Sequence, residues 1–344
     1  MIRFECDYLE GAPQEVINAI GKVNFEQNPG YGDDSHCARA KALIKEACAA
    51  EDSEVFFVVG GTQANLTIIG AVLKNYQGVI APVTAHINCH EAGAIEATGH
   101  KVLTVRTADG KLLPEQIDKI CRDYWNETHC THIVQPGMVY ISQTTEVGTL
   151  YSKAEVAAIY ETCKKNKLKL FIDGARIGYA VQAPGSDLTL ADLPRCCDVF
   201  TIGGTKQGAL FGEAVVVNDE ELKKEFPYHV KQRGALLAKG WLLGVQYEVL
   251  FTDNLFLKLA DHAAQLAVKL REGFKAAGFE FLYDHETNQQ LPVFTPEQVK
   301  KLSRKYTFDH FADMKDGRIA TRFCTSWATR EEAIDALLED IKTL

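Results

Sequence analysis

The chain has 344 residues, 46% hydrophobic and 24% charged, which is enough for one large globular domain and a smaller one. Its formal net charge of -9 argues against nucleic acid or an anionic membrane as a partner, because both require basic patches. No run approaches the roughly 20 apolar residues of a membrane helix. The acidic N-terminus does not resemble a signal peptide, so we expect a cytoplasmic protein.

The ten cysteines are scattered and form no Cys-x-x-Cys pair, which favours free thiols packed as small apolar side chains. Histidine and cysteine gather at two places, residues 86–90 and 129–132. Neither group has the spacing of a zinc site, so we expect no metal.

Helical and strand-like segments alternate over the first part of the chain. Residues 35–50 have helical periodicity, with Ser35 as the expected N-cap. The expected strands are apolar or β-branched runs at 55–59, 79–80, 101–105, 132–135, 168–172 and 199–202, and a helix over 65–74 follows the first of them. This alternation predicts an α/β domain around a largely parallel sheet, whose ligands bind at the carboxyl ends of the strands.

The pattern changes beyond about residue 250. Residues 256–277 carry a repeating apolar face that predicts one long helix. Further strands are expected over 279–283 and 318–324, and further helices over 296–305 and 329–341.

These elements predict two domains. Residues 1–250 would form the large domain, with residues 1–30 as an N-terminal arm near the active site, and residues 251–344 would form a small α+β domain.

Two short motifs follow expected strands, Asp173-Gly174-Ala175-Arg176 and Gly203-Gly204-Thr205-Lys206. Taken singly, Lys206 fits a solvated loop lysine, Asp173 a helix cap and Arg176 a surface ion pair. Together they supply the groups that pyridoxal 5'-phosphate requires. These are an amine for the Schiff base, an acid at the pyridine nitrogen and a cation for a substrate carboxylate.

Gly60-Gly61-Thr62 opens a helix directly after a strand, where free amides and the helix dipole favour a phosphate. The alternative is a tight turn with Thr62 as the N-cap. The segment matches no nucleotide-binding fingerprint, which argues against a nicotinamide enzyme. His86 follows a strand and a Pro-containing loop; it is either a hydrogen-bonded loop histidine or an imidazole that stacks on a cofactor and transfers protons.

In their order along the chain, these motifs resemble those of the low-specificity L-threonine aldolases, within the aromatic amino acid β-eliminating lyase superfamily of fold-type I pyridoxal-phosphate enzymes. The resemblance runs nearly end to end. It comprises Tyr31-Gly32-Asp33-Asp34, Gly60-Gly61-Thr62-Gln63-Ala64-Asn65, His86 with Glu91-Ala92-Gly93-Ala94, Asp173 to Arg176, Gly203 to Lys206, and Arg318 to Thr325. It implies a large cofactor-binding domain with a mostly parallel sheet and a small C-terminal domain.

The resemblance also implies a role for each matching residue. Lys206 would form the Schiff base, and Asp173 would bind the pyridine nitrogen. Gly61 and Thr62 would hold the phosphate, while His86 would stack on the ring and assist proton transfer.

The substrate site follows from the same resemblance. Arg176 and Arg322 would bind the substrate carboxylate, and Tyr31 would line the pocket of its own or the neighbouring subunit. The resemblance favours a homodimer or homotetramer with shared active sites.

Three positions depart from the family pattern. Cys6-Asp7 stands where many threonine aldolases have Ser-Asp, and a thiol is a poorer hydrogen-bond donor than a hydroxyl. Thr205 replaces a serine before Lys206. The glycine-rich arginine segment that holds phosphate across the dimer is replaced by residues 231–240, where Lys231, Arg233 and Lys239 all remain candidates.

The expected activity is a pyridoxal-phosphate-dependent cleavage of a β-hydroxy-α-amino acid, of the threonine or allo-threonine type, into glycine and an aldehyde, with His86 as the base. The cofactor residues serve equally for a β-eliminating lyase or an aminotransferase acting on another amino acid. A non-catalytic binding protein of the same fold is a third alternative, against which the complete set of Lys206, Asp173, Arg176 and Arg322 argues.

Overall fold

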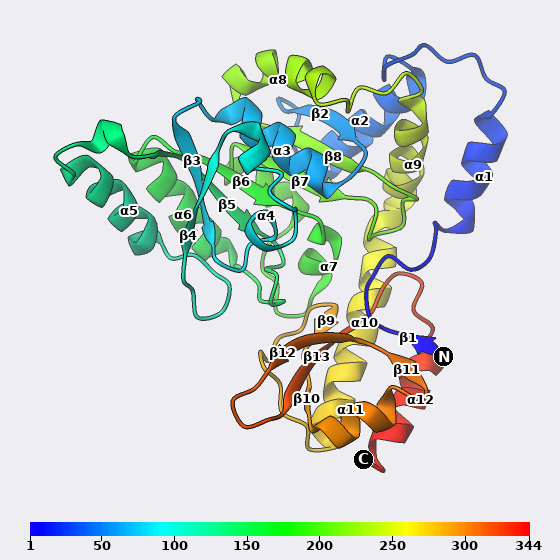
Figure 1. Ribbon diagram of the computed structural model, residues 1–344. Helices are drawn as coiled ribbons and strands as arrows, with labels where there is room; N and C mark the ends of the chain where they lie inside the picture. Colours follow the sequence, from blue (N-terminus) through cyan, green and yellow to red (C-terminus); the bar gives the residue numbers. More distant parts are fainter.

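A seven-stranded sheet lies between two layers of helices, and a smaller sheet lies near the C-terminus, in the computed structural model of residues 1–344 (Figure 1). The strand order is β2-β8-β7-β6-β5-β3-β4, and β8 alone runs against the others. The strands are β2 (Glu54–Val58), β3 (Gln77–Pro82), β4 (Lys101–Val105), β5 (Gln135–Ser142), β6 (Lys169–Asp173), β7 (Val199–Gly203) and β8 (Glu213–Val217). The predicted α/β fold with a mostly parallel sheet is confirmed.

Helices bury both faces of this sheet. One face packs against α2 (Ser35–Cys48), α5 (Pro114–Asn126), α6 (Lys153–Lys165), α7 (Ile177–Gln182) and α9 (Trp241–Phe251). The other packs against α3 (Gly61–Val72), α4 (His86–Cys89) and α8 (Glu220–Gln232). Short 3-10 turns are η1 (Glu96–Thr98), η2 (Cys130–His132), η3 (Leu190–Arg195) and η4 (Thr252–Asn254).

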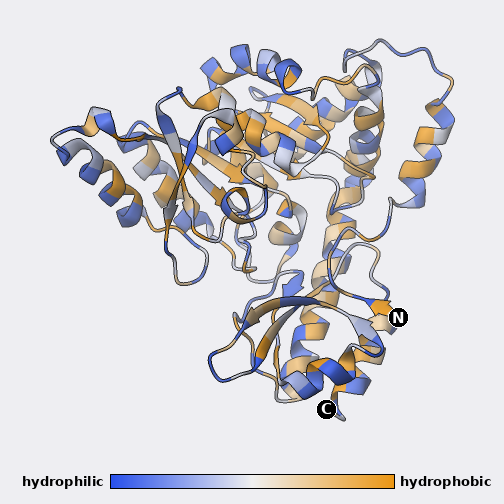
Figure 2. Cartoon of the chain, viewed as in Figure 1, coloured by the Kyte–Doolittle hydropathy of each residue, from blue (hydrophilic) through white to orange (hydrophobic).

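The strands read as continuous apolar runs because successive side chains enter two different cores. In β8, Val215 and Val217 pack with α3 and α8, whereas Ala214 and Val216 pack with the helices of the opposite face. Figure 2 shows the sheet as mainly hydrophobic and the outer helices as mixed. None of the helices combines the length and apolar character needed to cross a bilayer.

The long helix α10 (Leu255–Ala276) leads from the large sheet's helices to the C-terminal part (Figure 1). There β9 (Gln289–Gln290), β10 (Val293–Phe294) and β12 (Asp309–Asp313) pair with β13 (Ile319–Cys324), beside α11 (Pro296–Leu302) and α12 (Glu331–Ile341). The N-terminal strand β1 (Ile2–Arg3) pairs with β11 (Tyr306–Thr307), and α1 (Gln14–Val23) packs along α9. The first residues of the chain are therefore anchored in its last part.

The structure corrects several local expectations. Residues 279–283 form no strand, because Phe279 packs its ring against Phe274 and Phe294 without a ladder, and only a bridge from Phe281 to Pro292 remains. The strand expected at 132–135 begins only at Gln135, after the turn η2.

Two further corrections concern α2 and β8. The N-cap of α2 is Asp34 rather than Ser35, since the Asp34 side chain accepts a hydrogen bond from the Cys37 amide. Strand β8 was absent from the expected elements, although it completes the sheet between β2 and β7.

Candidate active site

Two strand ends meet at the carboxyl edge of the large sheet, where β6 ends at Asp173 and β7 ends at Gly203. A Cβ atom on Gly174 would lie 1.9 Å from the Thr201 carbonyl oxygen, and one on Gly203 would lie 2.4 Å from the Ala175 carbonyl oxygen. Only glycine allows the two turns to approach so closely. This approach brings the Asp173 motif against the turn that carries Lys206.

The carboxylate of Asp173 is buried and held from three sides. Its Oδ2 accepts hydrogen bonds from the Tyr140 hydroxyl at 2.6 Å and from Asn65 Nδ2 at 3.2 Å, and its Oδ1 accepts one from the Ala175 amide at 2.9 Å. Burial, together with the neighbouring Asp173 charge, raises the pKa of Tyr140 well above its ordinary value, so Tyr140 remains a donor. Asp173 is therefore a fixed acceptor at the strand end.

His86 begins the short helix α4 and is oriented by a buried acid, Glu91. The distance from His86 Nδ1 to Glu91 Oε1 is 2.7 Å, and the same oxygen accepts a hydrogen bond from Asn65 Nδ2 at 2.6 Å. Burial lowers the pKa of His86, but the Glu91 hydrogen bond and the charges of Glu146 and Asp173 raise it, and the net shift is upward. Asn65 thus links the acid that orients His86 to Asp173.

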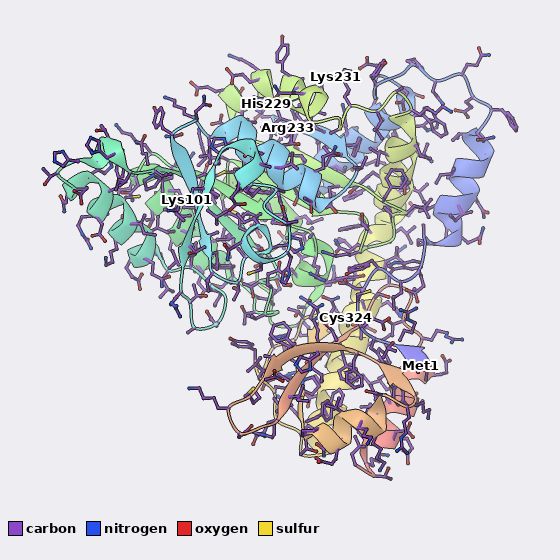
Figure 3. All side chains as sticks on the ribbon, in the orientation of Figure 1. Met1, Lys101, His229, Lys231, Arg233 and Cys324 are labelled. Atoms are coloured by element: carbon purple, nitrogen blue, oxygen red, sulfur yellow. The ribbon has the colours of Figure 1, made fainter.

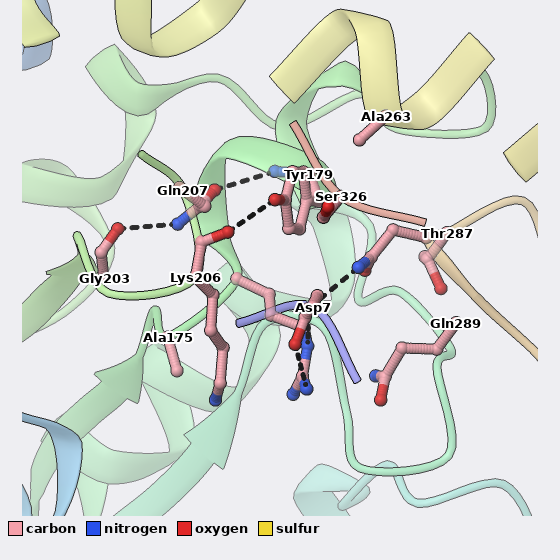
Figure 4. A network of polar contacts seen from close by, with 12 residues as sticks. Asp7, Ala175, Tyr179, Gly203, Lys206, Gln207, Ala263, Thr287, Gln289 and Ser326 are labelled. Carbon is pink, nitrogen blue, oxygen red and sulfur yellow. Dashed lines mark hydrogen bonds and ion pairs between the residues drawn. The ribbon is translucent and has the colours of Figure 1, made fainter. Parts of the chain in front are cut away.

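The backbone of Lys206 is anchored on α7. The Tyr179 hydroxyl donates to the Lys206 carbonyl oxygen at 2.5 Å. Gln207 bridges the same turn, because its Nε2 donates to Gly203 O and its Oε1 accepts from the Tyr179 amide. Figure 4 shows the Lys206 side chain extending from this anchored backbone toward Ala175.

A cavity of about 530 Å³ brings four of the eight expected site residues together, namely Lys206, His86, Arg176 and Arg322. Its lining includes His86, Lys206, Arg176, Arg322, Glu146 and Tyr8. An amine, an imidazole, a carboxylate and two guanidinium groups therefore face one space.

The guanidinium of Arg176 forms a buried ion pair with Asp7, from the N-terminal arm. Arg176 Nε lies 2.7 Å from Asp7 Oδ2 and Nη2 lies 3.0 Å from Oδ1, while Asn288 Nδ2 donates to Asp7 Oδ2 at 2.9 Å. Burial opposes both charges, but the pair raises the pKa of Arg176 and lowers that of Asp7. Asp7 occupies the Nε–Nη2 edge of the Arg176 fork, so Nη1 and the second N–H of Nη2 are left for a substrate carboxylate.

Arg322 and Tyr31, both expected at the substrate site, lie in different places. Arg322 Nη2 lies 2.8 Å from Asp309 Oδ2, and its buried Nε has no hydrogen-bond partner. Tyr31 is half exposed, lies under Lys231 Nζ at 4.6 Å from its ring centroid, and lines a separate small cavity beside α2. Within one chain, therefore, Tyr31 does not join Lys206.

The turn expected to hold the phosphate is open. Helix α3 starts at Gly61, no side chain caps its N-terminus, and a Cβ atom on Gly60 or Gly61 would meet no atom within 4 Å. A 12-residue helix with free N-terminal amides and space in front of them suits an anion. The residues at this turn therefore fit the phosphate group of a cofactor.

Lys231 and Arg233 lie at the end of α8, beside α3 (Figure 3). The Arg233 guanidinium approaches Gly70 of α3, and its buried Nε has no partner. In neither histidine–cysteine cluster do three His, Cys, Asp or Glu side chains converge. His129 and His132 instead stack with their ring centroids 5.1 Å apart.

Glu146 and Glu213 were not singled out from the sequence, whereas Asp7 and Glu91 were named there only as parts of family motifs. Glu213 begins β8, is 4% exposed, and its Oε2 has no hydrogen-bond partner. Burial and the charge of Asp173 raise the pKa of Glu213 to about 8, although Lys206 opposes the shift. An acid at the start of an otherwise apolar strand is the signal that could have identified Glu213, whereas nothing local marks Glu146.

The fold and the convergence of these residues define a pyridoxal-phosphate-dependent lyase of fold type I. The chain belongs to the beta-eliminating lyase family, whose model matches residues 6–316.

Known proteins of similar sequence and structure agree with this membership. The chain is 33% identical to a low specificity L-threonine aldolase of Pseudomonas aeruginosa, over 99% of this chain and 97% of that one. A solved structure of a Leishmania major threonine aldolase is 42% identical, with a TM-score of 0.96, and the match covers 100% of this chain and 99% of that one. A putative L-allo-threonine aldolase of Listeria monocytogenes shares the fold at 14% identity and a TM-score of 0.77, over 99% of this chain and 96% of that one.

Proposed function

We propose that this chain cleaves a β-hydroxy-α-amino acid of the threonine type into glycine and an aldehyde, with pyridoxal 5'-phosphate as cofactor. The observation that carries the proposal is the single cavity that Lys206 shares with His86, Arg176 and Arg322, next to the fixed carboxylate of Asp173. The full-length similarity to threonine aldolases supports the choice of reaction.

Five residues would hold the cofactor. Lys206 would bind its carbonyl carbon and Asp173 its pyridine nitrogen, while Gly61 and Thr62 would receive the phosphate at α3 and His86 would stack on the ring. When bound, the cofactor supplies an electron sink for the bond that breaks between Cα and Cβ.

The proton of the substrate β-hydroxyl would pass to His86. Because Nδ1 of His86 is engaged by Glu91, the other nitrogen, Nε2, is the one available toward the cavity. Glu91 thereby sets the tautomer of the base. Glu146, which lines the same cavity, adds a negative charge that favours the protonated imidazole once it has formed.

The substrate carboxylate would bind between two guanidinium groups. Arg322 is held by Asp309 and Arg176 by Asp7, so neither must be ordered when the substrate arrives. Tyr31 would line the pocket of the neighbouring subunit in a homodimer or homotetramer. The ten free thiols, most of them buried or partly buried, are consistent with a cytoplasmic location.

The decisive experiment combines an absorbance spectrum with product analysis. Wild type and Lys206→Ala are mixed with pyridoxal phosphate, and the matched control is Lys258→Ala, an exposed lysine of α10. Wild type and the control should show the lysine-linked chromophore and release glycine and aldehyde from threonine or allo-threonine, and Lys206→Ala should do neither. 2-Oxobutanoate and ammonia as products, or a wild-type spectrum without the chromophore, would refute the proposal.

A further inference from the structure

Glu213 is a buried acid that the proposed reaction does not use. The residue is 4% exposed, and its Oε2 is enclosed without a hydrogen-bond partner. Buried polar atoms are normally paired, since an unpaired one loses the free energy of hydration. A polar group that arrives with the cofactor would supply this atom with a partner.

The strand register places this side chain under the N-terminus of α3. Glu213 pairs with Val58 of β2, two residues before Gly60. It also lies on the same face of β8 as Val215 and Val217, which pack against α3, because side chains two apart share a face. Its side chain therefore lies on the α3 face of the sheet, at the edge where β2 leads into the turn of Gly60 and Gly61.

The position across the sheet separates Glu213 from the end of the site that holds Asp173. Strand β8 is adjacent to β2, which leads into the phosphate turn, and β7 lies between β8 and β6. Asp173, on β6, would bind the pyridine nitrogen. Glu213 is therefore nearer in the sheet to the strand that leads into the phosphate turn than to the strand that carries Asp173.

The surroundings favour the neutral acid. Burial has the largest effect on Glu213 and favours the protonated acid. The charge of Lys206 favours the carboxylate, whereas the charge of Asp173 disfavours it. The Tyr247 hydroxyl, also nearby, donates to the carbonyl oxygens of Ile202 and Gly212. A neutral carboxyl group differs from a carboxylate in carrying an O–H donor, and a phosphate offers only acceptors.

We propose that Glu213, as a neutral carboxylic acid, donates a hydrogen bond to the cofactor phosphate at the N-terminus of α3. This inference rests on the proposed function, because it requires pyridoxal phosphate in the site. The helix amides and this O–H would bind the phosphate together, whereas an ionised Glu213 would repel it. Phosphate affinity would then decrease as Glu213 loses its proton.

The test isolates the phosphate by comparing pyridoxal phosphate with pyridoxal, which also reacts with Lys206 but has no phosphate. Dissociation constants for both are measured with the cofactor-free wild type, Glu213→Gln and Glu213→Leu, from the lysine-linked absorbance. The dissociation constant for pyridoxal divided by that for pyridoxal phosphate reports the contribution of the phosphate to binding. At neutral pH this ratio should change by less than about threefold in Glu213→Gln, which keeps an N–H donor, and decrease by about tenfold or more in Glu213→Leu.

The pH dependence provides an independent readout. Between pH about 6 and about 10 the ratio for wild type should decrease as the acid ionises, while that for Glu213→Gln should stay level. This arm decides the matter even if Glu213→Leu does not fold.

Three outcomes overturn the inference. One is an unchanged ratio in a folded Glu213→Leu, and another is a pH dependence of the wild type that is the same in Glu213→Gln. The third outcome is that Glu213→Leu loses equal affinity for pyridoxal phosphate and pyridoxal. The last would mean that Glu213 acts on Lys206 instead. A wild type that shows no lysine-linked absorbance with either ligand would instead refute the proposed function itself.

Discussion

The buried pair of Asp7 and Arg176 allows a quantitative prediction for Asp7→Asn. The Asp7 side chain is 0% exposed and that of Arg176 is 10% exposed, and Asp7 accepts two hydrogen bonds from Arg176 and one from Asn288. The substitution keeps the shape but leaves the guanidinium without a counter-charge. Removing one partner of such a pair costs about 3 to 5 kcal/mol of unfolding free energy.

The cost is measured by urea unfolding and by calorimetry. For a chain of 344 residues it corresponds to a decrease in Tm of about 4 to 7 °C. Glu10→Gln, which alters an exposed acid three residues further along, should change stability by less than about 0.5 kcal/mol and serves as the control.

A double-mutant cycle with Arg176→Gln tests the cause. If the pair is responsible, the two substitutions should be non-additive by about 2 kcal/mol or more. Additive effects, or a loss below about 1 kcal/mol in Asp7→Asn, would refute the reasoning. The stabilisation by Asp7 should also disappear in acid, because its folded pKa is lowered, so the contribution is present above the unfolded value and is lost as pH decreases through the folded one.

Three further predictions concern the other site residues. Glu91→Gln should lower the pKa of His86, so the acidic limb of the pH–rate profile should move to lower pH and kcat should decrease. An unchanged profile would exclude Glu91 as the group that orients His86. Gly174→Ala should give little folded protein by circular dichroism, because its Cβ would lie 1.9 Å from a carbonyl oxygen, and a well-folded variant would show that the two turns can separate. In urea at pH about 8, Glu213→Gln should be about 1 to 4 kcal/mol more stable than the wild type, with little difference near pH about 5. Burial raises the pKa of Glu213 in the folded protein, so its ionisation in the unfolded chain opposes folding as the pH increases. Equal stabilities of the two proteins at both pH values would contradict this.

The sheet was largely predictable because its central strands are buried on both faces and therefore appear as continuous apolar runs. Asp173 and Lys206 could be located because each follows such a run at the carboxyl end of a strand, where ligands bind in this class of fold. Local signals failed where packing decided the outcome, as for residues 279–283, whose aromatic side chains enter a core without forming a strand.

The partners of the expected residues were less predictable than the residues themselves. Arg176 was expected at a substrate carboxylate, but its ion pair with Asp7 joins residues 169 apart, and no local pattern carries that information. The link from Glu91 through Asn65 to Asp173 likewise depends on the way α3 crosses the sheet. Tyr31 lies away from the Lys206 cavity in one chain, so its expected role depends on a second subunit.

The anchoring of the first residues in the last part of the chain has a consequence for synthesis. Asp7 contacts Asn288, which follows it by 281 residues, and Arg322 reaches the same cavity from β13. A ribosome releases Asp7 long before either partner exists, so the large sheet can assemble while the cavity is still incomplete. In a nascent chain truncated before residue 288, Arg176 would be paired with an arm that lacks the Asn288 contact. The complete cavity can form only after Arg322 has been synthesised.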